Sequence, residues 1–129
     1  MPRFERSGGA AGPIVQGFGG GGFSVDGGIY RALLLNPERA LAWDAPPLGA
    51  LTLESVAPIL VLEPPPEFLL LGTGAAHRFA PRAFVAALEA RGIGVEAMDS
   101  RAAARTWGLL RGEERWIAAA LMPLDEAAR

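Results

Sequence analysis

The second half of the chain alternates short apolar runs with helical patterns. Residues 68–71 are large and apolar and stop at Gly72-Thr73-Gly74, which predicts a buried strand that opens into a loop. The same kind of pattern predicts strands at residues 93–98 and 116–122, and helices between Pro81 and Gly92 and at residues 101–110. Because an alternation of strand and helix requires crossover connections, at least one pair of strands is expected to be parallel.

The first half is predicted to be an antiparallel meander of short strands. The turns between these strands are signalled by glycines and by Asn36-Pro37. The meander is expected to add strands to the mixed sheet of the second half, or to pack against it as a small separate sheet. A short helix is predicted at residues 52–57, with Thr52 as its N-cap. The predicted strands are residues 13–18, 23–26, 29–35 and 40–43.

The chain is predicted to be one α/β domain over residues 13–123, between a flexible arm at residues 1–12 and a short tail at residues 124–129. Of the 129 residues, 50% are hydrophobic and 20% are charged, which favours a packed core over disorder. No apolar run approaches the roughly 18 residues of a membrane span, and the arm lacks the apolar stretch of a secretory signal. We therefore expect no integral membrane segment.

Composition excludes several kinds of chemistry. The net charge of −2 gives no support for a nucleic-acid partner. All 12 basic residues are arginine, which excludes Schiff-base and P-loop lysines. The absence of cysteine excludes disulfides, thiolate metal ligands and cysteine nucleophiles, and the single histidine, His77, cannot build a histidine-rich metal site. We expect no cofactor and no metal.

The glycine-rich residues 17–22 match the G-x-G-x-x-G pattern of dinucleotide sites. In those sites a helix begins directly after the glycines, so that its N-terminus meets the pyrophosphate. Here Phe23-Ser24-Val25 continues as a strand. The match is therefore interpreted as accidental, and the glycines as a hairpin or bulge loop.

The loop Gly72-Thr73-Gly74 is a stronger candidate for a site, because open α/β sheets bind ligands at the carboxyl ends of their strands. Asp99 ends the next strand, so the two loops are expected to lie side by side, like a Rossmann glycine loop and its ribose-binding acid. His77, however, stands where the third glycine would be, and the next helix starts only near Arg82. We favour the interpretation that glycine is needed where the loop and a helix pack close to the strand end.

A second cluster opens the predicted helix that follows Asp99. Asp99 or Ser100 can cap this helix, and Arg101 and Arg105 share one of its faces. A helix N-terminus between two arginines could bind a carboxylate or a phosphate. Solvated or salt-bridged arginines are nevertheless favoured over an anion site.

No catalytic residue is predicted. His77 is a conceivable general base, but no Ser, Cys or acid stands at a telling spacing, and no G-x-S-x-G motif or carboxylate pair occurs. The candidates for lining a ligand pocket between the two loops are Gly72, Thr73, Gly74, His77, Asp99, Ser100, Arg105 and Thr106.

Five segments, taken in order, resemble a known family of small domains. They are Ile14 to Phe23 (I-V-x-G-F-G-x-G-G-F), Leu70 to Gly74, Gly92 to Glu96, Met98 to Trp107 and Arg115 to Leu121. The family comprises uncharacterised bacterial and archaeal proteins together with the mitochondrial respiratory complex I assembly factor 3. The resemblance covers nearly the whole chain, from about Gly12 to Pro123.

The resemblance implies a three-layer α/β fold around a central mixed sheet of about five strands. It also implies a bacterial cytoplasmic protein, associated peripherally with membrane complexes. One position departs from the family, which usually has Asn after the aromatic residue of its R-T-Y/W-N segment, where this chain has Gly108. If that Asn is catalytic in the family, its activity would be lost in this chain. If it only caps or bridges the backbone, its replacement by glycine is tolerated.

Two functions remain open. The first is a non-enzymatic protein-interaction domain, whose partner by resemblance is a respiratory-complex subunit or another assembly factor; it predicts an exposed apolar or aromatic patch. The second is a small anionic-ligand-binding protein or weak enzyme that uses the pocket between the Gly72-Thr73-Gly74 loop and the Asp99 helix start, with Arg105 directed inward. Either is compatible with a homo-oligomer.

Overall fold

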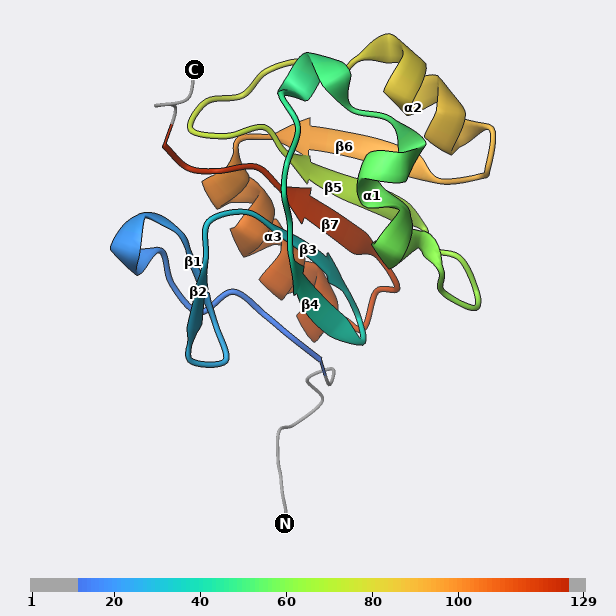
Figure 1. Cartoon of the computed structure of the whole chain (residues 1–129). Helices are drawn as coiled ribbons and strands as arrows, with labels where there is room; N and C mark the ends of the chain where they lie inside the picture. The colour runs from blue at the N-terminus through green and yellow to red at the C-terminus, as the bar shows by residue number, and fades with distance from the viewer. Residues whose placement is uncertain (1–11, 126–129) are drawn as a thin grey trace.

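A computed structural model describes residues 12–125, so most of the predicted arm (residues 1–12) and tail (residues 124–129) lies outside the described residues. Figure 1 shows the arrangement of the elements. The strands are β1 (Phe23–Val25), β2 (Gly28–Tyr30), β3 (Leu33–Asn36), β4 (Arg39–Ala42), β5 (Phe68–Gly72), β6 (Gly94–Met98) and β7 (Ala118–Leu121). The helices are α1 (Leu53–Leu60), α2 (Arg82–Glu89) and α3 (Ser100–Gly112).

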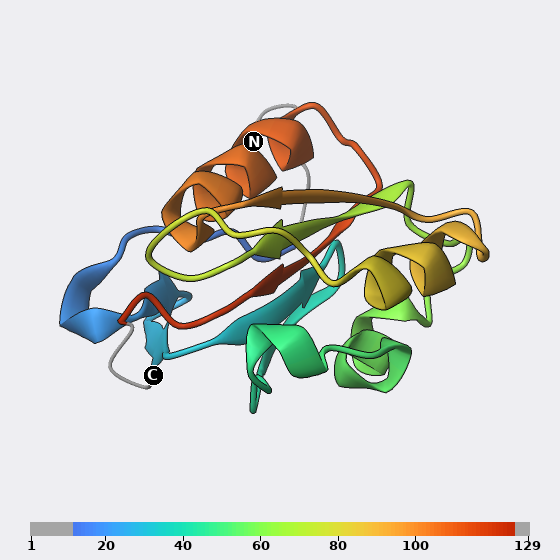
Figure 2. The ribbon, with the colours of Figure 1, turned by 90° about the horizontal axis from the view of Figure 1, so that it is seen from above.

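The fold has three layers around a five-stranded mixed sheet, in the strand order β4-β3-β7-β5-β6. Strand β5 is parallel to β6 and to β7, whereas β3 is antiparallel to β7 and to β4. Helices α1 and α2 cover one face of the sheet and α3 covers the other (Figure 2). The predicted fold class is confirmed, including the parallel pairs. Within residues 12–125, no helix has the length and apolar character needed to cross a bilayer.

Strand β5, which lies between β7 and β6, is apolar throughout because both of its faces are buried. Leu69 and Leu71 pack in the core beneath α1 and α2, while Leu70 packs in the core beneath α3. This is the alternation that a strand covered on both sides requires. The neighbouring strand β7 divides its residues between the two cores in the same way, with Ala118 and Ala120 on one side and Ala119 and Leu121 on the other.

The single strand predicted at residues 29–35 is wrong, because the chain bends at Arg31-Ala32 and the two halves enter different sheets. Strand β2 pairs with β1 in a separate two-stranded sheet, and β3 joins the central sheet. At the bend, the backbone N–H of Trp43 donates to the Ala32 carbonyl at 3.1 Å, and Arg31 forms an ion pair with Asp125 at 3.0 Å. Arg31 is the one charged residue in this otherwise apolar run, and it lies at the bend.

Two other predictions are corrected by the structure. The strand predicted at residues 13–18 is reduced to a single bridge between Gly17 and Ser24. Helix α1 is longer than predicted and runs through Pro58, which lacks the N–H that would bond to the Glu54 carbonyl. Both residues are exposed, so water can satisfy that carbonyl, and the burial of the opposite helix face stabilises the helix.

Trp107 on α3 anchors the segment around Pro13 to the domain. Its indole is fully buried, and its Nε1 donates a hydrogen bond to the carbonyl of Pro13 at 2.9 Å. A buried aromatic ring contributes a large apolar area, and its N–H has to find a partner. This one side chain therefore connects residues that are 94 positions apart.

We predict that Trp107→Phe destabilises the domain by about 1–3 kcal/mol, because it leaves the Pro13 carbonyl without its donor and part of the ring volume empty. Urea unfolding followed by circular dichroism measures the change. Leu109→Ala, at a side chain on the same helix that is 66% exposed, is the control and should change stability by less than about 0.5 kcal/mol. Equal effects of the two variants would contradict the anchoring role of Trp107.

Candidate functional site

The predicted loop Gly72-Thr73-Gly74 is joined to the start of α3 by Ser100. The Ser100 N–H donates to the Gly74 carbonyl at 2.8 Å, and the Gly74 N–H donates to Ser100 Oγ at 2.9 Å. The same hydroxyl donates to the carbonyl of Met122, just after β7, at 2.8 Å. Because Ser100 is fully buried, its hydroxyl connects the ends of β5 and β7 to α3 in a site without competing water.

Glycine is required at position 72 by the close approach of Ser100. A Cβ added to Gly72 would lie 2.7 Å from Ser100 Oγ and 2.9 Å from Ser100 Cα. Gly74, at the end of the loop, has a φ of +105°, a conformation that favours glycine. The interpretation that glycine permits close packing at the strand end is therefore confirmed at Gly72.

Thr73 is fully buried and stabilises the turn that follows it. Its backbone N–H donates to the Met98 carbonyl at 2.8 Å. Its hydroxyl donates to the Ala76 carbonyl at 2.8 Å and accepts from the Arg78 N–H at 3.0 Å. These contacts are internal to the fold, and none of them involves an acid or a histidine. Neither Thr73 nor Ser100 is therefore positioned as an activated nucleophile.

The remaining candidates on α3 are spread along the helix. Asp99 is the N-cap and accepts a hydrogen bond from the Ala102 N–H at 2.9 Å, as predicted. Thr106 is half-buried, and its hydroxyl lies 3.5 Å from the Met98 sulfur. Arg105 is exposed, six residues after the cap. The structure thus brings Ser100 to the glycine loop but leaves Arg105 on the surface of α3.

The other polar residues considered at this end of the sheet face aromatic rings. The exposed His77 ring lies edge-on to Phe79, with centroids 5.6 Å apart. The guanidinium of Arg101 lies 5.8 Å from the centre of the Phe18 ring, the distance of a cation–π contact. Within residues 12–125, no group of three or more His, Asp or Glu side chains is arranged to hold a metal ion.

A cavity of about 440 Å³ lies at the carboxyl ends of β5 and β7, and we name it the β5–β7 cavity. It shares Thr73 and Gly74 with the predicted pocket, but its other walls come from segments that the sequence pattern does not connect to that loop. Figures 1 and 2 show the chain after β7 running beside the loop that follows β5. The lining residues are Ala45, Pro46, Pro47, Leu48, Gly49, Thr73, Gly74, Arg78, Met122, Pro123 and Asp125.

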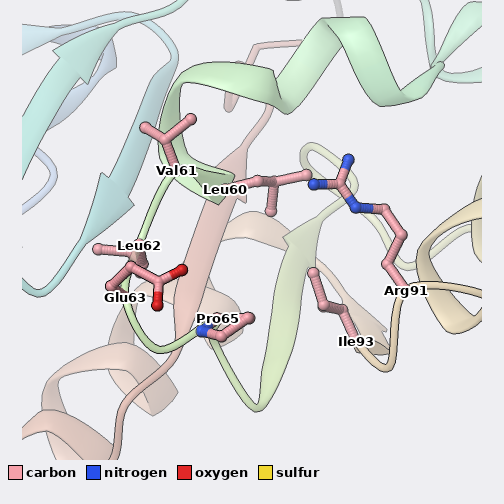
Figure 3. Close-up of a pocket in the computed structure, with 7 residues that line it drawn as sticks. All are labelled: Leu60, Val61, Leu62, Glu63, Pro65, Arg91 and Ile93. Atoms are coloured by element: carbon pink, nitrogen blue, oxygen red, sulfur yellow. The ribbon is translucent and has the colours of Figure 1, made fainter.

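A second hollow, of about 410 Å³, lies at the amino ends of β5 and β6, and we name it the α1 groove (Figure 3). Leu60, Leu62 and Ile93 are buried and form its apolar floor. Figure 3 shows Arg91 reaching from the turn before β6 toward Leu60, with Glu63 on the segment after α1. The remaining lining residues are Val61 and Pro65.

The segment of the α1 groove that contains Pro64 and Pro65 is held in place by hydrogen bonds with residues that do not line the groove. The Trp116 indole donates to the Pro64 carbonyl at 2.6 Å, and the Glu67 N–H donates to the Trp116 carbonyl at 2.8 Å. Arg115 forms an ion pair with Glu67 at 2.6 Å, and this hydrogen bond lowers the pKa of Glu67 and raises that of Arg115. Because the folded pKa of Glu67 is lowered, the pair stabilises the segment at neutral pH and is lost as acid protonates the carboxylate.

We predict opposite effects of alanine at two glycines. Gly72→Ala should destabilise the domain by about 1–3 kcal/mol, because its Cβ would overlap Ser100. Gly108→Ala, inside α3 and with nothing within 4 Å of its added Cβ, should stabilise by roughly 0.5–1 kcal/mol. Denaturant unfolding of both variants measures the difference, and a Gly72→Ala protein as stable as wild type would contradict the close-packing interpretation.

Comparisons with known proteins identify relatives of this chain. A protein of Danio rerio named NADH dehydrogenase (ubiquinone) 1 alpha subcomplex assembly factor 3 is 31% identical over 121 residues, which cover 93% of this chain and 70% of that protein. An uncharacterised protein of Rhodobacter capsulatus is 32% identical over 124 residues, covering 95% of this chain and 94% of its own.

The fold is also found in solved structures. The crystal structure of a Bordetella parapertussis protein superposes with a TM-score of 0.77 at 33% identity, covering 88% of this chain and 97% of that one. The family described as "Protein of unknown function (DUF498/DUF598)" matches residues 15–122, which include both hollows except Pro123 and Asp125. The chain belongs to this DUF498/DUF598 family, which the sequence resemblance had indicated.

Proposed function

We propose that this chain is a non-enzymatic protein-interaction domain that assists the assembly of a respiratory NADH dehydrogenase complex, and that it binds its protein partner in the α1 groove. The role is suggested by the name of the Danio rerio relative. In this proposal the chain acts in the bacterial cytoplasm and associates peripherally with the membrane complex. The observation that carries the proposal is the chemistry of the α1 groove.

The α1 groove combines an apolar floor with an exposed apolar rim. Leu60 and Ile93 are buried beneath it, whereas the Val61 side chain is 73% exposed at its edge. Protein–protein interfaces characteristically have an apolar centre surrounded by polar residues. A partner side chain inserted between Val61 and the floor would remove this apolar surface from water.

The charges at the rim are available to a partner. The side chains of Glu63 and Arg91 are exposed, and neither forms a hydrogen bond or ion pair with another side chain or backbone group that the structure describes. Charges at an interface rim steer association and select the orientation of the partner. A partner segment with an acidic residue facing Arg91 and a basic residue facing Glu63 would complement both of these charges.

The groove is also ordered before any partner binds. The hydrogen bonds from Trp116 to Pro64 and from Glu67 to Trp116 fix the proline segment. A wall that is already fixed loses less conformational entropy on binding, so more of the contact energy contributes to affinity. A non-enzymatic role is supported by the internal hydrogen bonding of Thr73 and Ser100, which leaves neither hydroxyl beside a base.

We predict that Val61→Asp reduces the recovery of NADH dehydrogenase subunits with the tagged chain by about tenfold or more, because a charge would enter the apolar centre of the contact. Affinity purification from the native host and quantitative mass spectrometry measure the recovery. Leu109→Asp, an exposed position on α3 outside the groove, is the control and should retain the subunits. Recovery that is unchanged by Val61→Asp would exclude the groove as the contact.

The assembly role itself requires a second measurement. Deletion of the gene should lower the amount of fully assembled NADH dehydrogenase on a native gel, and wild-type protein should restore it. Arg91→Glu should restore it only in part, because it reverses a rim charge of the α1 groove. A deletion strain with normal amounts of the assembled complex would contradict the assembly role.

A further inference from the structure

We propose that the β5–β7 cavity binds a small apolar molecule with a single carboxylate, and that Arg78 binds the carboxylate. This site is separate from the α1 groove, and the two share no lining residue. The inference is therefore independent of the proposed partner. It rests on the position of the cavity, the apolar character of its walls and the charges that face it.

The position of the cavity is the one where α/β sheets bind small molecules. Strands β5 and β7 are parallel, with Gly72 opposite Leu121 at their carboxyl ends, and the cavity is lined by residues that follow both strands. Ligands of open α/β sheets bind outside these carboxyl ends. The volume of about 440 Å³ lies within the range of about 300–1,000 Å³ that small-molecule pockets occupy.

Most of the cavity wall is apolar. Pro46 and Leu48 line it from the segment before α1, and Met122 and Pro123 line it from the segment after β7. The three prolines of the lining, Pro46, Pro47 and Pro123, lack an N–H, so this part of the wall offers few hydrogen-bond donors. Such walls favour a hydrocarbon body over a sugar or a nucleotide.

The charged residues that line the cavity are Arg78 and Asp125. Asp125 is already paired with Arg31 at 3.0 Å. The Arg78 guanidinium forms no hydrogen bond or ion pair with any residue in the described part of the chain. Its planar fork of donors matches the two oxygens of a carboxylate.

The backbone N–H groups at the ends of β5 and β7 are already hydrogen-bonded within the fold. The N–H of Thr73 donates to Met98, that of Gly74 to Ser100 Oγ, and that of Met122 to Gly72. Phosphate sites in loops use several free backbone N–H groups directed at one point. At the strand ends, Arg78 is therefore the charged donor that lines the cavity, and its one guanidinium matches a single carboxylate.

The test is isothermal titration calorimetry of the full chain with octanoate, an eight-carbon monocarboxylate used as the probe. Wild-type protein should bind octanoate saturably, and Arg78→Ala should weaken binding by roughly tenfold, the effect of losing one charge-assisted hydrogen bond. Octanol, with the same chain and no charge, should bind wild type as weakly as octanoate binds Arg78→Ala. Arg82→Ala, at an exposed arginine of α2 outside the cavity, should bind octanoate like wild type.

Amide chemical-shift mapping of the octanoate titration locates the site. The shifts should fall on the amides of Ala45, Leu48, Gly49, Met122 and Asp125, which line the β5–β7 cavity. Absence of saturable binding at millimolar octanoate, equal binding by wild type and Arg78→Ala, or shifts confined to the α1 groove would overturn the proposal. Inorganic phosphate that binds as tightly as octanoate would also overturn it, because it would show that the apolar walls contribute nothing.

Discussion

The buried hydroxyl of Ser100 is the contact on which this end of the molecule depends. It accepts a hydrogen bond from the Gly74 N–H and donates one to the Met122 carbonyl, so it links the ends of two parallel strands to the first residue of α3. The serine lies so close to β5 that no side chain fits at Gly72. One small polar residue and one glycine thus determine where α3 begins relative to the sheet.

The hydrogen bonds of Ser100 also determine where a ligand can bind. The gap between the β5 loop and the α3 start, where the sequence predicts a pocket, is occupied by the hydrogen bonds of Ser100 with Gly74. The β5–β7 cavity lies instead beside residues 45–49 and Arg78. The α1 groove is at the amino end of the same strand β5, so the two proposed sites are separated by the length of the strand.

The parts of the fold that could be predicted from the sequence are those specified locally. The Asp99 cap and the buried strand over Leu69 and Leu71 depend on patterns within a few residues. The bend at Arg31-Ala32 was not predicted, because a single arginine in an apolar run does not by itself signal a bend, and the contacts with Trp43 and Asp125 that stabilise it are distant in sequence.

The site was predicted only in part for the same reason. The glycine loop is recognisable in the sequence, because glycines directly after an apolar run indicate a tight loop at the end of a strand. Arg78 and the walls of the β5–β7 cavity could not be identified, since they meet only through the pairing of β3 with β7 and of β7 with β5. Arg105 is prominent in the sequence pattern, yet the helix presents it to solvent.

Amide hydrogen exchange of Ser100→Ala is the most direct test of the central role of this hydroxyl. The substitution leaves the Gly74 N–H and the Met122 carbonyl without their buried partner. We predict faster exchange at Gly74 and a loss of about 2–4 kcal/mol in the free energy of unfolding. Exchange at Gly74 and a free energy of unfolding that are both unchanged from wild type would contradict the role assigned to Ser100.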